Sequence, residues 1–302
     1  MSSTRYSRWK RTTPSPVHRS TLGGTLTRFF ATFVVVVRPK RRRRHENTLL
    51  SEKEASQFDP MSSHACEARD DPRVYIVGYG SLMSIESARR TMPDLDDFTP
   101  ALIFGWRRHF NLVSISALRR GLVSDDALRT GHVAAVTVRG GYPVSDALLV
   151  SLFRIPSGQV PGYLEREARY RFETVDAYPI ATTALSIDDA LDNPSVAFER
   201  GQPVRATICV QFEDDEALFR ERFHSDATRY YEDVGQFYSG RLYRKDIFPM
   251  QDYLRLCLDA ARRLARDKGV RNFLTTSYLA DERTPLSQYV VDHCIGTSNP
   301  EQ

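Results

Sequence analysis

The apolar positions of this chain form short runs in its first two thirds and a helical repeat in its last third. Short apolar or β-branched runs bounded by Gly, Pro or polar residues predict strands. In the last third, apolar residues from Leu254 to Ala265 recur at i, i+3, i+4 and i+7, which predicts an amphipathic helix that Gly269 ends. The runs that predict strands are residues 74–77, 101–113 with a turn at Gly105, 132–138, 148–155, 172–175 and 204–212.

Two shorter helices are predicted between these runs, over residues 84–91 and 157–170. Most strands precede the main helices and do not alternate with them, so the pattern indicates an α+β class. We expect one domain over residues 73–290, with an N-terminal extension, 1–72, and a short tail, 291–302.

Charge is spread unevenly along the chain. Residues 1–45 hold twelve Lys or Arg and no Asp or Glu, which leaves 30 basic and 38 acidic residues in the remainder. The overall formal charge of +4 therefore hides a body with a net charge of −8. An acidic body argues against a nucleic-acid partner, since phosphate binding requires a basic face.

The N-terminal extension joins a nine-residue apolar run, 29–37, to a basic cluster, 38–44. The run is shorter than the roughly 20 residues that a membrane span needs, and no small-residue cleavage site follows it. The Arg- and Ser-rich composition fits an organelle transit peptide, whereas the basic cluster fits a nuclear signal. A disordered tail, or sequence ahead of a start at Met61, is an equal alternative. We expect disorder in each case, and a cytoplasmic protein unless a transit peptide directs it to a mitochondrion or plastid.

The four cysteines, Cys66, Cys209, Cys257 and Cys294, are far apart in sequence and form no Cys-x-x-Cys pair. The seven histidines are equally dispersed. Neither a zinc site nor a disulfide framework is indicated, and we predict no metal.

The segment Gly78-Tyr79-Gly80-Ser81-Leu82 directly follows the first predicted strand. Its glycines allow positive φ values and a close approach of backbone to ligand, and successive N–H groups in such a loop can hold an anion. Met83 stands where a dinucleotide fingerprint or a nucleophile elbow needs glycine, so Ser81 is not expected to be a nucleophile. Taken alone, the loop is explained as a tight turn.

Two carboxylates, Glu165 and Glu167, lie on the predicted helix that ends at Tyr170. Side chains two positions apart on a helix point in nearly opposite directions, so at most one of them can face a pocket. Taken alone, this segment is explained as an exposed, charged helix.

Together with two segments between them, the loop and the acidic helix resemble the γ-glutamylcyclotransferase superfamily, which includes ChaC-type enzymes and plant AIG2-like proteins. The intervening segments are Gly-Trp-Arg-Arg-His-Phe-Asn-Leu at 105–112 and Leu-Phe-Arg-Ile-Pro at 152–156. The order agrees over about residues 74–175 and fades beyond them.

The resemblance implies a small mixed β-barrel flanked by helices and a carbon–nitrogen lyase that needs no cofactor. Its substrate would be a small γ-glutamyl amide, with neither a nucleic acid nor a membrane as partner. The substrate's own α-amine would attack its γ-carbonyl, giving 5-oxoproline and a free amine, amino acid or peptide.

The resemblance also assigns roles by motif. It makes Glu167 the group that moves the proton, which suits a carboxylate whose pKa burial would raise. It implies that the N–H groups of Gly80, Ser81 and Leu82 bind the substrate's α-carboxylate. Tyr79 and Tyr170 would wall the pocket.

Two departures leave alternatives open. One residue, not two, separates Tyr163-Leu164 from Arg166-Glu167, which keeps Glu165 as a second candidate. Residues 219–289 match no segment of the glutathione-cleaving members, and the role of the C-terminal region 213–290 is not indicated, so the γ-glutamyl substrate stays open. The competing functions are a non-catalytic binding module of the same fold and an amidase that uses water.

Overall fold

The computed structural model describes residues 72–293. The expectations for residues 1–71, namely disorder, targeting or a start at Met61, lie outside the described residues. So do residues 294–302 of the predicted tail and the thiols of Cys66 and Cys294.

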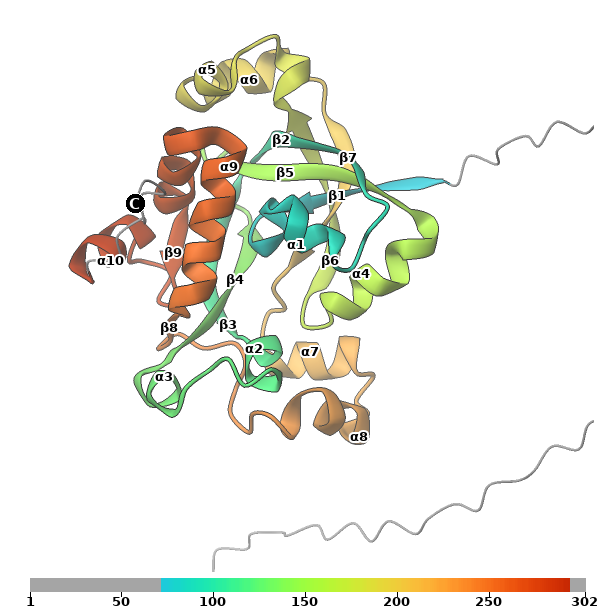
Figure 1. The fold of residues 1–302 in the computed structure, drawn as a ribbon, viewed down its shortest axis with the longest axis vertical. Coiled ribbons are helices and arrows are strands. Elements are labelled where there is room, and N and C mark those ends of the chain that lie inside the picture. The colour runs from blue at the N-terminus through green and yellow to red at the C-terminus, as the bar shows by residue number, and fades with distance from the viewer. Residues whose placement is uncertain (1–71, 294–302) are drawn as a thin grey trace, which may run out of the picture. The chain divides into compact units, whose positions relative to one another are not determined.

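A closed five-stranded barrel forms the centre of the described fold (Figure 1). Neighbouring strands are antiparallel except β1 and β7, which pair in parallel, so the barrel is mixed. β5 is buried at nine of its ten residues because side chains on its outer face, such as Phe153, are covered by helices. In order around the barrel the strands are β1 (Arg73–Gly78), β5 (Ala147–Pro156), β2 (Asp96–Phe104), β6 (Arg171–Pro179) and β7 (Val204–Val210).

A second, four-stranded sheet lies beside the barrel and is joined to it where Gln211 N–H donates to the Val138 carbonyl, at 3.2 Å. The motif strand β3 lies inside this sheet, between β4 and the C-terminal strand β9, which runs parallel to it. The order is β8 (Phe248–Pro249), β4 (His132–Gly140), β3 (Trp106–Val113) and β9 (Ser277–Leu279).

Helices flank the barrel and the sheet, which confirms the predicted α+β class with a small mixed β-barrel. The helix predicted at 84–91 is present, and Ser84 caps it by accepting the Ser87 N–H. Within residues 72–293, no helix is long and apolar enough to cross a membrane. The helices are α1 (Ile85–Arg89), α2 (Ile115–Arg119), α3 (Asp125–Thr130), α4 (Val160–Arg166), α5 (Ile187–Asp192), α6 (Pro194–Arg200), α7 (Asp215–Arg222), α8 (Ala227–Tyr230), α9 (Gln251–Thr275) and α10 (Leu286–Asp292).

Two predicted helix ends are wrong. α4 stops at Arg166, four residues before Tyr170. α9 does not end at Gly269 but bends sharply at Ala265 and Arg266, where Arg266 takes a φ of 47°, and then continues. A Cβ on Gly269 would lie 2.2 Å from the Ala261 carbonyl oxygen, so glycine here allows the second half of the helix to pack on the first.

The C-terminal segment after this bend attaches to the barrel through polar contacts. The side chain of Asn272 accepts from the Leu149 N–H and donates to the Ala147 carbonyl, both at 2.9 Å, and thereby continues the hydrogen bonding of β5. Phe273 is fully buried, and β9 then pairs with β3. The Asn-Phe-Leu segment at 272–274 therefore attaches the long helix to the barrel.

Arg108 of β3 is fully buried and pairs with no carboxylate of the residues that the structure describes. Its guanidinium donates to the Tyr79 carbonyl and to the Thr276 hydroxyl, each at 2.8 Å, and to the Leu149 carbonyl. It also lies 4.5 Å from the centre of the Phe273 ring. Burial lowers its pKa to about 9, so the group is still charged at neutral pH.

Replacing the Arg108 side chain by an apolar one of similar length tests how much its hydrogen bonds contribute to stability. Arg108→Met leaves the Tyr79, Leu149 and Thr276 oxygens without their donor, and we expect the free energy of unfolding to fall by about 3 kcal/mol. Arg205→Met is the control, since Arg205 is 74% exposed and makes a long surface ion pair. Urea titrations of both variants decide, and equal unfolding midpoints would contradict the role of Arg108.

Candidate active site

The site predicted from the sequence forms one small cavity where the barrel meets the second sheet. All six predicted residues line it, with Val136 of β4, Cys209 of β7 and Tyr253 of α9 beside them. The cavity itself has a volume of about 20 Å³, room for about one water molecule. The six residues are Tyr79, Gly80, Ser81, Leu82, Glu167 and Tyr170.

The glycines of the loop are needed for space and not for positive φ. Neither Gly78 nor Gly80 has a positive φ, so that part of the prediction is wrong. A Cβ on Gly80 would lie 2.6 Å from a Val136 methyl and 2.7 Å from the Tyr253 hydroxyl, whereas one on Gly78 would meet the Ser151 hydroxyl at 2.5 Å. The loop thus passes closer to its neighbours than any side chain would permit.

Beyond Gly80 the chain turns into a short 3₁₀ helix, Ser81–Met83. Within residues 72–293, the N–H groups of Gly80 and Leu82 donate to no backbone carbonyl, and that of Ser81 faces the Tyr253 hydroxyl. The beginning of this turn therefore has N–H groups available to an acceptor in the cavity. Leu82 contributes its backbone, because its side chain is buried against α1 and α4.

Glu167 follows the last residue of α4, and its side chain is only 13% exposed. Burial raises the pKa of its carboxyl above the ordinary value, while Arg166 and then Arg169 act in the opposite direction. The Arg166 Nε lies 3.1 Å from Glu167 Oε1. A buried carboxyl with a raised pKa is suited to accept and return a proton.

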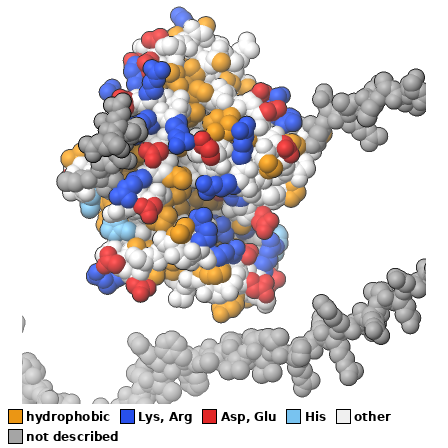
Figure 2. Space-filling model, viewed as in Figure 1, with side chains coloured by type: hydrophobic (Ala, Val, Ile, Leu, Met, Phe, Trp, Pro, Cys, Tyr) orange, Lys and Arg blue, Asp and Glu red, His pale blue; other side chains and the backbone are white. Residues whose placement is uncertain are grey.

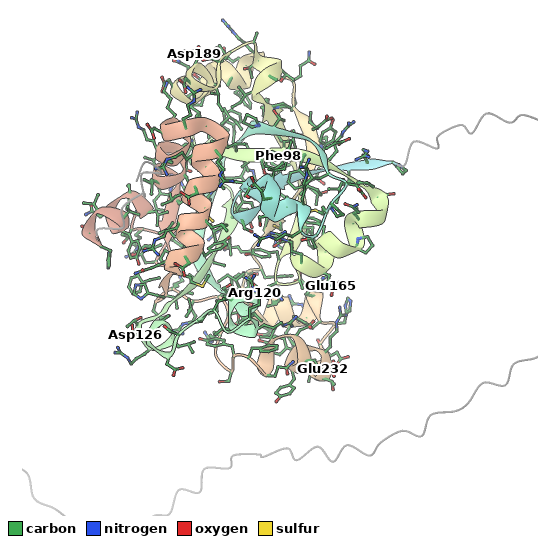
Figure 3. All side chains as sticks on the ribbon, in the orientation of Figure 1. Phe98, Arg120, Asp126, Glu165, Asp189 and Glu232 are labelled. Atoms are coloured by element: carbon green, nitrogen blue, oxygen red, sulfur yellow. The ribbon has the colours of Figure 1, made fainter. Side chains whose placement is uncertain are left out.

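Glu165 is exposed on α4 and lines no part of this cavity (Figure 3). The two carboxylates diverge as helical spacing predicts, and Glu167 is the one that faces inward.

Arg166 ties the acidic turn to the glycine-rich loop. Besides Glu167, its guanidinium binds the Ser87 carbonyl at 2.7 Å and the Thr91 hydroxyl at 2.9 Å. It also donates to the Ser81 hydroxyl at 3.2 Å. One side chain therefore sets the distance between the carboxylate and the loop.

The C-terminal part of the chain supports the same turn from the other side. Arg222 of α7 donates to the carbonyls of Leu164 and Ala168, at 2.8 and 3.1 Å, which the end of α4 leaves unpaired. The Tyr243 hydroxyl donates to the Arg169 carbonyl at 2.7 Å.

Tyrosines and a thiol enclose the carboxylate. The Tyr170 hydroxyl donates to the Val136 carbonyl at 2.9 Å, and the Cys209 thiol lies 3.5 Å from the Tyr79 hydroxyl. Burial raises the pKa of Cys209 and of Tyr253, so both are protonated at neutral pH. Sequence reasoning missed these last two, because each reaches the cavity from an element distant in sequence.

A wider cleft of about 450 Å³ adjoins the cavity and shares Ser81, Glu167, Tyr170 and Tyr253 with it. This volume lies in the range of small-molecule sites. Among residues 72–293, no three His, Cys, Asp or Glu side chains cluster as a metal site would require.

The close approach at Gly80 can be tested against a glycine with open space. Gly80→Ala places a methyl group against Val136 and the Tyr253 hydroxyl, and we expect a loss of about 1–3 kcal/mol in stability. Gly158→Ala, where a Cβ meets nothing within 4 Å, should leave stability unchanged or slightly higher. Thermal unfolding of the two variants measures this, and a Gly80→Ala protein as stable as the parent contradicts the geometry.

No family model and no curated protein matches the sequence. Solved structures do match. One titled "Gamma-glutamyl cyclotransferase" is 12% identical, with 57% of this chain and 94% of that chain covered and a TM-score of 0.33. A glutathione-specific γ-glutamyl cyclotransferase from yeast is 13% identical, with 72% and 99% covered and a TM-score of 0.39. YkqA from Bacillus subtilis is 13% identical, with 70% and 55% covered and a TM-score of 0.40.

At these identities and TM-scores the matches assign neither an activity nor a substrate to this chain. Structures titled as γ-glutamyl cyclotransferases are among those that the chain matches.

Proposed function

We propose that the protein is a γ-glutamylcyclotransferase-type lyase, which converts a γ-glutamyl amide to 5-oxoproline and a free amine, amino acid or peptide. The observation that carries the proposal is one buried carboxylate with a raised pKa, Glu167, in the same cavity as a turn with available N–H groups.

The reaction forms one bond and breaks one. The substrate's α-nitrogen attacks its own γ-carbon, and the bond from that carbon to the leaving nitrogen breaks. The α-nitrogen must lose a proton and the leaving nitrogen must gain one, so a single carboxylate beside both can carry it. Glu167 has this role, and its raised pKa makes both the uptake and the return of the proton accessible.

Ring closure also requires the substrate to fold on itself. The N–H groups of Gly80, Ser81 and Leu82 would hold the α-carboxylate while Tyr79 and Tyr170 confine the chain, which makes the attack intramolecular in a fixed geometry. The Tyr253 hydroxyl lies close to the Ser81 N–H, and Tyr253 lines both the inner cavity and the wider cleft. We expect this side chain to turn aside when substrate binds, which would join the inner cavity to the cleft.

Product analysis tests the reaction. The full chain should release 5-oxoproline from at least one of glutathione, γ-glutamyl-alanine and γ-glutamyl-lysine. Glu167→Gln should reduce kcat by at least about 100-fold, as expected for loss of a general acid–base group. Glu165→Gln, at an exposed position near the end of α4, is the matched control and should keep full activity.

Free glutamate in place of 5-oxoproline would identify an amidase instead. Absence of turnover on all three substrates would favour the binding module, and loss of activity in the Glu165 variant alone would transfer the catalytic role to that residue.

The pH profile tests the environment of Glu167 separately. As a base it acts deprotonated, so kcat should fall on the acid side with a midpoint above the ordinary carboxyl pKa of about 4.5. Arg169 lowers this pKa, and Arg169→Gln should therefore move the midpoint to higher pH. Arg205→Gln provides the control, and coincident acid limbs for all three proteins would show that Glu167 is not the titrating group.

A further inference from the structure

The wider cleft carries more positive charge than its own acids can neutralise. Four arginines line it, at the ends of α1 and α2 and beside Glu167, against the two carboxylates of Glu167 and Asp252. Both carboxylates have partners, since Glu167 pairs with Arg166 at 3.1 Å and Asp252 with Arg255 at 2.9 Å. The four lining arginines are Arg90, Arg120, Arg166 and Arg169.

Three guanidiniums are left over. Arg90, Arg120 and Arg169 form no ion pair with any carboxylate among residues 72–293. Arg120 donates to the Ser116 carbonyl at 3.0 Å, and Arg169 to the Arg166 carbonyl at 3.3 Å, and neither contact neutralises charge. The cleft thus has a surplus of three positive charges.

This surplus runs against the charge of the rest of the chain. Outside residues 1–45, acidic residues exceed basic ones by eight, yet the cleft is basic (Figure 2). Blue side chains gather near the middle of the visible face, between α2, α4 and α9. Because a concave surface focuses the field of like charges, the cleft attracts anions even though the protein around it is acidic.

The three unpaired side chains are all arginines, which indicates the chemical class of the anion that the cleft binds. Each of the three side chains ends in a planar fork that binds a carboxylate through two parallel hydrogen bonds. Arg169 lies two residues after Glu167 in the turn that follows α4, whereas Arg90 and Arg120 lie at the ends of α1 and α2. One positive fork is therefore near the proton-transfer group, and two are farther along the cleft.

We propose that this cleft binds the part of the substrate that is released, and that this part is a dicarboxylate, namely an acidic amino acid joined through its α-nitrogen to the γ-carboxyl of glutamate. Arg169 would bind the carboxylate next to the bond that breaks, and Arg90 and Arg120 the more distant one. The inference rests on the proposed function for the γ-glutamyl half of the ligand and adds the chemistry of the other half.

Binding to the Glu167→Gln chain tests the proposal without turnover. Isothermal titration would compare γ-glutamyl-glutamate with γ-glutamyl-glutamine, which has the same shape and one negative charge fewer, and with γ-glutamyl-lysine. We expect γ-glutamyl-glutamate to bind at least about 10-fold more tightly than the glutamine ligand, with a preference that shrinks as salt rises. Adding Arg120→Gln should remove most of this preference, and adding Arg205→Gln should leave it intact.

Equal affinity for the glutamate and glutamine ligands, tighter binding of the lysine ligand, or no binding of any of the three would overturn the inference. The proposed reaction is judged by whether the unmutated chain releases 5-oxoproline from γ-glutamyl-glutamate or from any of the three substrates named above. If that chain releases 5-oxoproline while the charge preference is absent, the acidic leaving group is wrong and the reaction stands. If the preference is present but no 5-oxoproline forms, the cleft binds acidic ligands and the reaction is wrong.

Discussion

The buried guanidinium of Arg108 is the contact on which the geometry of the site depends. It reaches from β3 to the carbonyl of Tyr79 in the glycine-rich loop, to β5 of the barrel and to the end of α9. Taking a cation out of water costs several kcal/mol, and no carboxylate in the described part of the chain offsets that cost. Carbonyl and hydroxyl oxygens do so instead, together with the ring of Phe273. The guanidinium therefore forms hydrogen bonds with three chain segments, and these bonds fix the relative positions of the segments.

The candidate site uses this fixed frame in two layers. Arg108 donates to the Tyr79 carbonyl of the loop, while Arg166 donates to the Ser81 hydroxyl and pairs with Glu167. Arg222 and Tyr243 then secure the turn that follows α4. The carboxylate is thus positioned by arginines from β3, α4 and α7 and by Tyr243, which explains how a residue just past a seven-residue helix can be held in place.

Sequence reasoning reached the parts of this arrangement that are local. The glycine-rich loop directly follows a strand, and helical spacing separates Glu165 from Glu167, so both could be predicted from neighbouring residues. Cys209 and Tyr253 could not, because they enter the cavity through barrel closure and the packing of α9. Gly80 was identified for the wrong reason, since its neighbours Val136 and Tyr253 are distant in sequence. The end of α9 was missed because a glycine that serves packing looks in sequence like one that ends a helix.

The bend in α9 constrains how this chain can vary over evolution. The half before the bend brings Tyr253 to the cavity, and the half after it brings Asn272 and Thr276 to β5 and Arg108. The two halves touch at small residues, with Gly269 resting on Ala261 and Ala265. A larger side chain at one of these positions would displace Tyr253 together with Asn272 and Thr276. A larger side chain at any one of these three positions should therefore be accommodated only together with compensating substitutions at the others.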